Sequence, residues 1–117
     1  MTINEAIAAL HAELIQGELN GGNIEDAELT GAYTSDLLSD VMANARDGGA
    51  LITIQAHKNT VAVATLVNIS LIVVCNSRPI PEDMILAARE EGIAIIRTGE
   101  NQFTVSGKLY EFMKAHR

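Results

Sequence analysis

The chain is poor in aromatic residues, which make up 3% of its 117 residues and include no tryptophan. This scarcity argues against a protein that binds single-stranded nucleic acid, because such proteins stack bases on exposed aromatic rings. Positive charge is also low: eight Lys and Arg residues against fifteen Asp and Glu residues give a net charge of −7. Binding to a phosphate backbone or to an anionic membrane surface requires clustered positive charge, so we expect neither nucleic acid nor membrane as a partner.

Cysteine is nearly absent as well. The single cysteine, Cys75, leaves no intrachain disulfide, and we expect a cytoplasmic protein. Together with Cys75, His11, His57 and His116 have spacings unlike those of metal ligands, so we expect neither a metal nor another cofactor. The N-terminus lacks the basic segment of a signal peptide. The longest apolar stretch, Val61–Val74, is interrupted by polar residues and falls short of the roughly 20 residues that span a bilayer.

Uninterrupted apolar runs are what the chain does have, and they predict its strands. Three runs without polar alternation, Leu51–Ile54, Leu71–Val74 and Ile93–Ile96, predict strands over Ala50–Gln55, Leu71–Cys75 and Ile93–Arg97. Such runs are typical of strands buried on both faces, as in a mostly parallel sheet covered by helices. The sequence therefore predicts an α/β fold, and its length predicts a single domain over residues 1–117.

Helical periodicity and start signals predict five helices between and around these strands. We expect them near residues 2–12, 34–45, 61–67, 81–92 and 102–115. Thr2 with Glu5 makes a capping box, Thr34 or Ser35 is the expected cap of the second helix, and Pro81 lies in the first turn of the fourth. The segment 61–67 is β-branched, yet parallel strands on either side need a crossover, so we expect a helix.

Two short segments have ambiguous patterns. Glu13–Gln16 is either the last turn of the first helix or a short strand. Glu28–Tyr33 is a short extended piece interrupted by Gly31. Within it, Thr30, Gly31 and Tyr33 belong to a turn that either cradles a phosphate or positions the Tyr33 side chain for packing.

Polar residues gather where the predicted strands end, and ligands of parallel sheets bind outside the carboxyl ends of the strands. We therefore expect a site for a small anionic metabolite or nucleotide at this edge, against the alternative that these polar residues only solvate loops. Its candidate residues, with the turn residues above, are Gln55, His57, Asn59, Asn76, Arg78, Arg97 and Thr98.

A catalytic site is the weaker interpretation. His57 at a strand end could shuttle a proton with Asp36 or Asp40, which lie four residues apart in the predicted second helix. The alternative is that Asp36 complements the helix dipole and Asp40 is a solvated surface residue. The segment Ser106-Gly107-Lys108 lacks the upstream glycine of a phosphate-binding loop and falls within a helix, so no kinase activity is expected.

A longer pattern resembles a known family. The ordered set formed by Leu29–Ala45, Ile52–His57, the Val-Ala-Val-Ala run, Gly92-Ile93 and Gly107–Tyr110 is similar to the DRTGG domain family over nearly the whole chain. The family's Asp-Arg start is replaced around Asp26-Ala27-Glu28, and Ala32 stands for its second glycine. The resemblance implies a three-layer α/β/α fold like the N-terminal domain of HPr kinase/phosphorylase. It also implies a regulatory or assembly role, because such domains stand beside CBS modules in some inorganic pyrophosphatases and form part of the N-terminal region of some phosphotransacetylases.

These observations favour a non-catalytic regulatory or interaction module that forms a homo-oligomer, with a dimer favoured. The expected contact surface is the last helix, on which four large apolar residues gather: Phe103, Tyr110, Phe112 and Met113. The alternatives are a small enzyme that uses His57 with Asp36 or Asp40, and an adaptor that binds a protein partner and no ligand.

Overall fold

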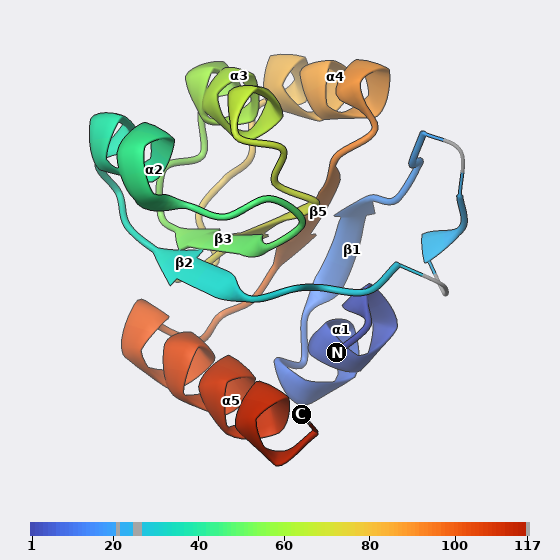
Figure 1. Ribbon diagram of the computed structural model, residues 1–117. Helices are drawn as coiled ribbons and strands as arrows, with labels where there is room; N and C mark the ends of the chain where they lie inside the picture. Colours follow the sequence, from blue (N-terminus) through green and yellow to red (C-terminus); the bar gives the residue numbers. More distant parts are fainter. Residues whose placement is uncertain (21, 25–26, 117) are drawn as a thin grey trace.

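The computed structural model describes residues 1–20, 22–24 and 27–116 and contains a five-stranded sheet in the order β1-β5-β4-β3-β2 (Figure 1). Strands β2 to β5 run parallel to one another, and β1 pairs antiparallel with β5. The mostly parallel sheet expected from the apolar runs is therefore confirmed. The strands are β1 (Glu13–Gln16), β2 (Ala32–Thr34), β3 (Ala50–Thr53), β4 (Leu71–Val74) and β5 (Ala94–Arg97).

Helices cover both faces of this sheet, which gives the three-layer α/β/α arrangement (Figure 1). Three helices lie on one face: α2 (Leu38–Asn44), α3 (Lys58–Leu66) and α4 (Glu82–Glu91). The other face carries α1 (Ile3–Ala9) and α5 (Gln102–Ala115). The fold class expected from the sequence and from the resemblance is confirmed.

The sheet separates two hydrophobic clusters, because successive side chains of a strand point to opposite faces. In β4, Leu71 and Val73 pack towards α1 and α5, whereas Ile72 and Val74 pack towards α2, α3 and α4. All four residues of β3 and of β4 are buried. Burial on both faces explains why these strands read as continuous apolar runs rather than alternating ones.

The β-branched crossover segment is a helix, as the topology requires. Helix α3 begins after His57 and joins two parallel neighbours, β3 and β4. The capping box of Thr2 and Glu5 is also present, and α4 ends at Gly92 in the left-handed conformation (φ 69°). Pro81 lies one residue before α4, at its N-cap, rather than inside the first turn. The ambiguous Glu13–Gln16 is a strand.

The expected start of the second helix is wrong. Helix α2 has Leu37 at its N-cap, with no side-chain cap. The two predicted caps are used elsewhere: Thr34 belongs to β2, and the Ser35 hydroxyl accepts a hydrogen bond from the N–H of Leu37 at 3.2 Å. Little of this helix is buried, because Leu37 is 64% exposed and Val41 is the one buried residue of α2.

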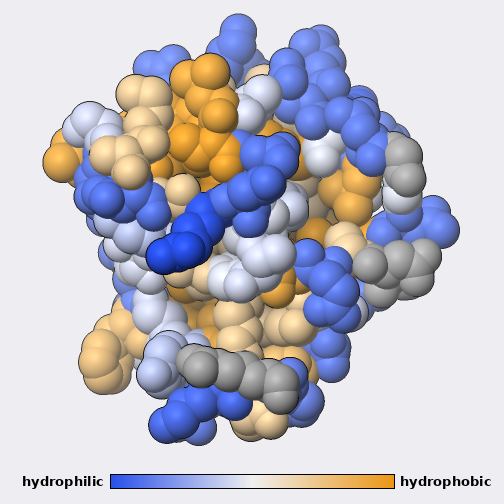
Figure 2. All heavy atoms as spheres, in the orientation of Figure 1, coloured by the Kyte–Doolittle hydropathy of each residue, from blue (hydrophilic) through white to orange (hydrophobic). Residues whose placement is uncertain are grey.

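The surface is unevenly polar. Figure 2 shows hydrophilic residues over α4 and hydrophobic ones over the neighbouring α3, where Leu66 is 74% exposed. Within the described residues, none of the helices has the length and hydropathy needed to cross a bilayer. Asp26, which belongs to the segment where the sequence departs from the DRTGG motif, lies outside the described part of the chain.

Candidate functional site

The carboxyl ends of the parallel strands meet at one end of the sheet, its carboxyl edge, as expected. Strands β3, β4 and β5 are neighbours with parallel register. Gln55 and His57 follow β3, Asn76 and Arg78 follow β4, and Arg97 ends β5. These residues therefore share an edge, which is the geometric condition for a common site.

Thr30 and Gly31 precede β2 and therefore lie at the opposite, amino-terminal edge of the sheet. The Thr30 hydroxyl donates to the carbonyl of Asp47 at 2.7 Å, and the Gly31 carbonyl accepts from the N–H of Ala50 at 2.9 Å. These two bonds tie the turn before β2 to the start of β3. The ten candidate residues consequently do not form one site.

Tyr33 and Asp40 form a contact between β2 and α2. The Tyr33 hydroxyl donates to the Asp40 carboxylate, at 2.9 Å from both oxygens. Hydrogen bonds from Ser35, Tyr33 and Asn44 lower the pKa of Asp40, and the same carboxylate raises the pKa of Tyr33. Asp40 is thus a structural acceptor rather than a free surface charge, and Tyr33 is positioned for packing.

Asp36 is the residue at this edge that the sequence interpretation misplaced. It precedes α2 rather than lying in its first turn, so it does not share a helix face with Asp40. Its Oδ1 accepts hydrogen bonds from the Thr53 hydroxyl (2.9 Å), the N–H of Ile54 (2.9 Å) and the amide of Gln102 (3.0 Å). This one oxygen links the end of β2, the end of β3 and the start of α5.

His57 has a structural partner as well. It is the N-cap of α3, where its Nδ1 accepts from the N–H of Asn59 at 3.0 Å. Helix caps of this kind satisfy a backbone donor that the helix itself leaves free. A test of catalysis by His57 therefore needs His57→Asn, which keeps a capping acceptor, beside His57→Ala.

The polar side chains at the end of β5 also make contacts within the fold. The Arg97 Nε forms an ion pair with Glu13 at 2.7 Å, and its Nη1 donates to the carbonyl of Arg78 at 3.3 Å. Thr98 is buried, and its hydroxyl donates to the carbonyl of Leu10 at 2.8 Å. The Thr98 hydroxyl is thus used inside the fold, and two of the five N–H donors of Arg97 are used for internal contacts.

Backbone donors at the edge are largely used within the fold. In the loop after β4, the N–H of Asn76 donates to the Glu100 carbonyl (3.0 Å) and that of Ser77 donates to the Thr98 carbonyl (2.9 Å). An anion held here would therefore depend on side chains. Of the predicted site residues at this edge, Gln55, His57, Asn59, Asn76 and Arg78 are exposed.

Cys75 lies behind this edge and is buried. Burial, together with the negative charge of Asp36, raises the pKa of the Cys75 thiol to about 11. A thiol with so high a pKa stays protonated and is a poor nucleophile at neutral pH. Among the residues that the structure describes, no three His, Cys, Asp or Glu side chains converge as a metal site would need.

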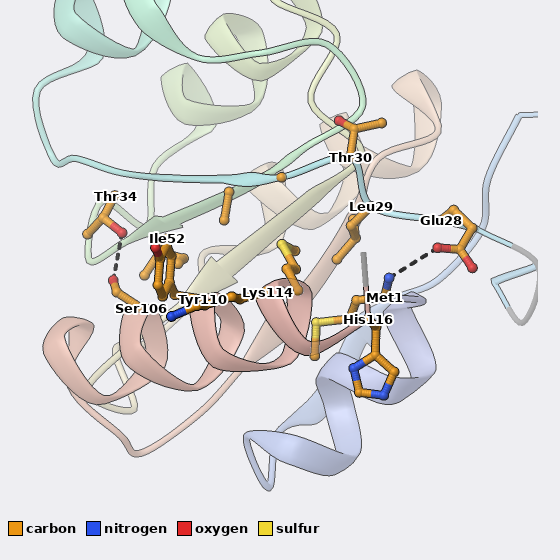
Figure 3. Close-up of a pocket in the computed structure, with 13 residues that line it drawn as sticks. Met1, Glu28, Leu29, Thr30, Thr34, Ile52, Ser106, Tyr110, Lys114 and His116 are labelled. Atoms are coloured by element: carbon orange, nitrogen blue, oxygen red, sulfur yellow. Dashed lines mark hydrogen bonds and ion pairs between the residues drawn. The ribbon is translucent and has the colours of Figure 1, made fainter.

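A pocket of about 740 Å³ lies elsewhere, between α5 and β2 (Figure 3). The hydroxyls of Thr34 and Ser106 share a hydrogen bond of 2.7 Å at one end, and the amino group of Met1 pairs with Glu28 at the other. Its floor is apolar, with Leu29, Ile52 and Met113 among the lining residues. The sequence offered no signal for this pocket, because its walls come from segments that lie far apart in the chain.

The exposed aromatic residues are on α5. Phe103 is 87% exposed and Tyr110 is 63% exposed, as expected of a contact surface on this helix. Phe112 and Met113 are partly buried: the Phe112 ring stacks on His116 at 4.1 Å between centroids, and Met113 packs against the core. The apolar surface of α5 is therefore narrower than the sequence suggested.

Comparisons with known proteins give a match in structure and none in sequence. No family model matches the chain, and no curated protein does. Among solved structures, the fold is similar to the CBS and DRTGG domains of the regulatory region of the Clostridium perfringens pyrophosphatase, which was crystallised with its activator diadenosine tetraphosphate. The TM-score is 0.71 at 16% identity, over 92% of this chain and 45% of that chain. The chain thus spans less than half of that structure and has a DRTGG-like fold.

Proposed function

We propose that this chain is a non-catalytic regulatory module that acts by self-association through the outer face of α5. The fold neighbour is a regulatory region, which supports the regulatory class. One observation on this chain carries the mode of action: a projecting ring and an open hollow lie side by side on the same helix.

The ring is that of Phe103, and the hollow lies over Gly107, where an added Cβ would have no neighbour within 4 Å. The hollow is shallow and wide open to solvent, and the residues that line it include Phe103, Lys108 and Phe112. A two-fold symmetric interface uses the same patch on both copies, so a protrusion and a hole on one patch complement each other. Each Phe103 would fill the hollow over the partner's Gly107.

This interface would be modest in size. A buried aromatic ring removes about 150–250 Å² from water, whereas a stable interface buries about 1,200–2,000 Å² in total. Two Phe103 rings supply only part of that area, and the rest must come from the flanks of α5. We therefore expect a dimer that dissociates on dilution, which suits a regulatory equilibrium.

The test is the mass of the full chain in solution, by light scattering and by sedimentation at tens of micromolar and below. Phe103→Ser removes the ring, and Gly107→Leu fills the hollow while raising helix propensity by about 0.5–1 kcal/mol. Both variants are expected to be monomers, and Gly107→Leu to unfold at a temperature no lower than the parent. Leu66→Ser on α3 is the matched control and leaves the dimer intact. A parent chain that is monomeric even at tens of micromolar contradicts the proposal.

A second candidate function is binding of a small anion or nucleotide at the strand edge. The guanidinium of Arg78 is exposed, and it takes part in none of the ion pairs found in the described part of the chain. Asn76 and His57 stand on the same edge, and the regulatory region with the similar fold was crystallised with a nucleotide activator. These side chains, rather than backbone amides, would carry the affinity.

Calorimetric titration of the full chain with diadenosine tetraphosphate tests this second function. A charge-assisted hydrogen bond to phosphate is worth about 1.5–3 kcal/mol, so Arg78→Ala is expected to weaken binding by tenfold or more. Arg46→Ala removes the same charge away from this edge and is expected to leave the affinity unchanged. Absence of heat at saturating ligand, or equal losses in both variants, rejects a site at the strand edge.

A further inference from the structure

Strand β2 has a free edge. It lies at the end of the sheet order, and among the described residues it pairs with β3 alone. The Gly31 carbonyl and the Ser35 N–H both bond towards β3, to Ala50 and Ile52. Backbone groups of successive strand residues alternate in direction, so the N–H and C=O groups of Ala32 and Thr34 point away from the sheet. The sequence Ala-Tyr-Thr carries neither a charge nor a proline, the usual protections of an exposed edge.

A hollow lies on each face of this edge. On the α5 face it is the pocket of about 740 Å³ between α5 and β2. On the α2 face a second hollow of about 440 Å³ is lined by Tyr33, Asn44 and Arg46. Both hollows include Thr30, Gly31 and Ala32 among their walls, so they lie back to back on the strand.

We propose that the free edge of β2 binds an extended acidic peptide segment of another protein by strand addition. An added strand bonds to the outward N–H and C=O groups and sends alternate side chains to opposite faces, where pockets select them. Here alternate side chains would enter the two hollows in turn.

The chemistry of the hollows defines the peptide. The floor of the α5-side pocket includes Leu29, Ile52 and Met113, which suit large aliphatic side chains. Arg46 lines the other hollow, and Lys114 lies at the first (Figure 3). Neither cation is a member of an ion pair among residues 1–20, 22–24 and 27–116. Alternating aliphatic and acidic side chains therefore match the edge in shape and in charge.

A second copy of the chain fits this edge less well. Pairing of two β2 strands would present Ala32 and Thr34 to the α5-side pockets, since these two residues line that face. Their side chains are too small to fill a hollow of about 740 Å³. The pocket also shares no lining residue with the hollow over Gly107, so peptide binding and self-association are separable.

The experiment is a fluorescence anisotropy titration of the full chain with a labelled peptide, Ser-Leu-Asp-Leu-Asp-Ser. Saturable binding is expected to the parent and equally to Gly107→Leu, whatever the outcome for self-association. The reordered peptide Ser-Leu-Leu-Asp-Asp-Ser breaks the alternation and is expected to bind at least about tenfold more weakly. Two further peptides carry N-methyl groups on the backbone nitrogens of both Leu residues or of both Asp residues. Only one of these two peptides should lose binding, because alternate N–H groups of the added strand face β2.

Two variants of the protein complete the test. Ala32→Pro removes one outward N–H without breaking a sheet bond, and the loss of one hydrogen bond weakens binding by about fivefold to tenfold. Arg46→Glu reverses an exposed charge and is expected to fold normally. It should weaken binding of the acidic peptide by a similar factor and strengthen binding of the peptide in which Lys replaces both Asp residues. No saturation up to about 1 mM probe overturns the proposal. So does equal binding of both methylated peptides, or a change in protein mass that Ala32→Pro abolishes, which would indicate a second copy at this edge.

Discussion

Asp36→Ala is expected to lower the free energy of unfolding by about 2–4 kcal/mol. The substitution removes the oxygen that accepts from Thr53, Ile54 and Gln102, and it leaves three partly buried donors without a partner. Because these donors belong to β3 and α5 and the acceptor follows β2, the loss should loosen all three elements together. Urea unfolding followed by circular dichroism measures the change.

Asp36→Asn separates the hydrogen bonds from the charge. Its side-chain oxygen can still accept, so we expect about half the loss or less. Asp83→Ala in the first turn of α4 removes a carboxylate that is exposed, and its cost should stay within about 0.5–1 kcal/mol. If Asp36→Ala proves as mild as Asp83→Ala, the three hydrogen bonds do not hold this edge together.

Leu109→Ala is expected to cost about 2–5 kcal/mol. Leu109 is fully buried and anchors α5 to the sheet within the cluster that also holds Leu71 and Ile96. Removing three carbon atoms leaves a cavity that the surrounding strands fill only in part. Because α5 carries both the Phe103 surface and one wall of the pocket, weaker docking of the helix should impair self-association and peptide binding together.

Tyr110→Ala on the same helix is the matched control for stability. The Tyr110 side chain is 63% exposed, and replacing it should change the free energy of unfolding by about 0.5 kcal/mol or less. Amide hydrogen exchange adds a local measure, since the protection of α5 should fall in Leu109→Ala and persist in Tyr110→Ala. Equal stability of the two variants would mean that α5 is not held by its buried face.

Local sequence patterns predicted most helices and strands correctly. They succeeded where the burial of an element or a single residue type determines the local structure. Continuous apolar runs predict strands buried on both faces, and β3, β4 and β5 are such strands. Gly92 has a left-handed backbone at the end of α4, where an added Cβ would lie 2.5 Å from Asn20. The helix over the β-branched segment before Leu66 followed from topology, since parallel neighbours require a crossover.

The start of α2 could not be predicted by the same reasoning. Thr34, Ser35 and Asp36 are all good capping residues, yet each has a partner outside the ordinary capping position. Thr34 bonds to Ser106, Ser35 accepts from Leu37, and Asp36 accepts from β3 and α5. Contacts with residues 17 to 72 positions away decide two of these roles, and a local pattern holds no information about them.

The order of apolar and polar residues alone determined that this chain forms a mostly parallel sheet with helices on both faces, because burial on two sides requires uninterrupted apolar strands. Only the tertiary structure decided which polar groups remain available. In it, the side chains of His57, Arg97 and Thr98 have internal partners. Thr30 and Gly31 lie at the amino-terminal edge of the sheet, and a pocket lies beside β2. The physical reason is that burial depends on composition along each element, whereas hydrogen-bond partners and hollows depend on which distant elements come to lie side by side.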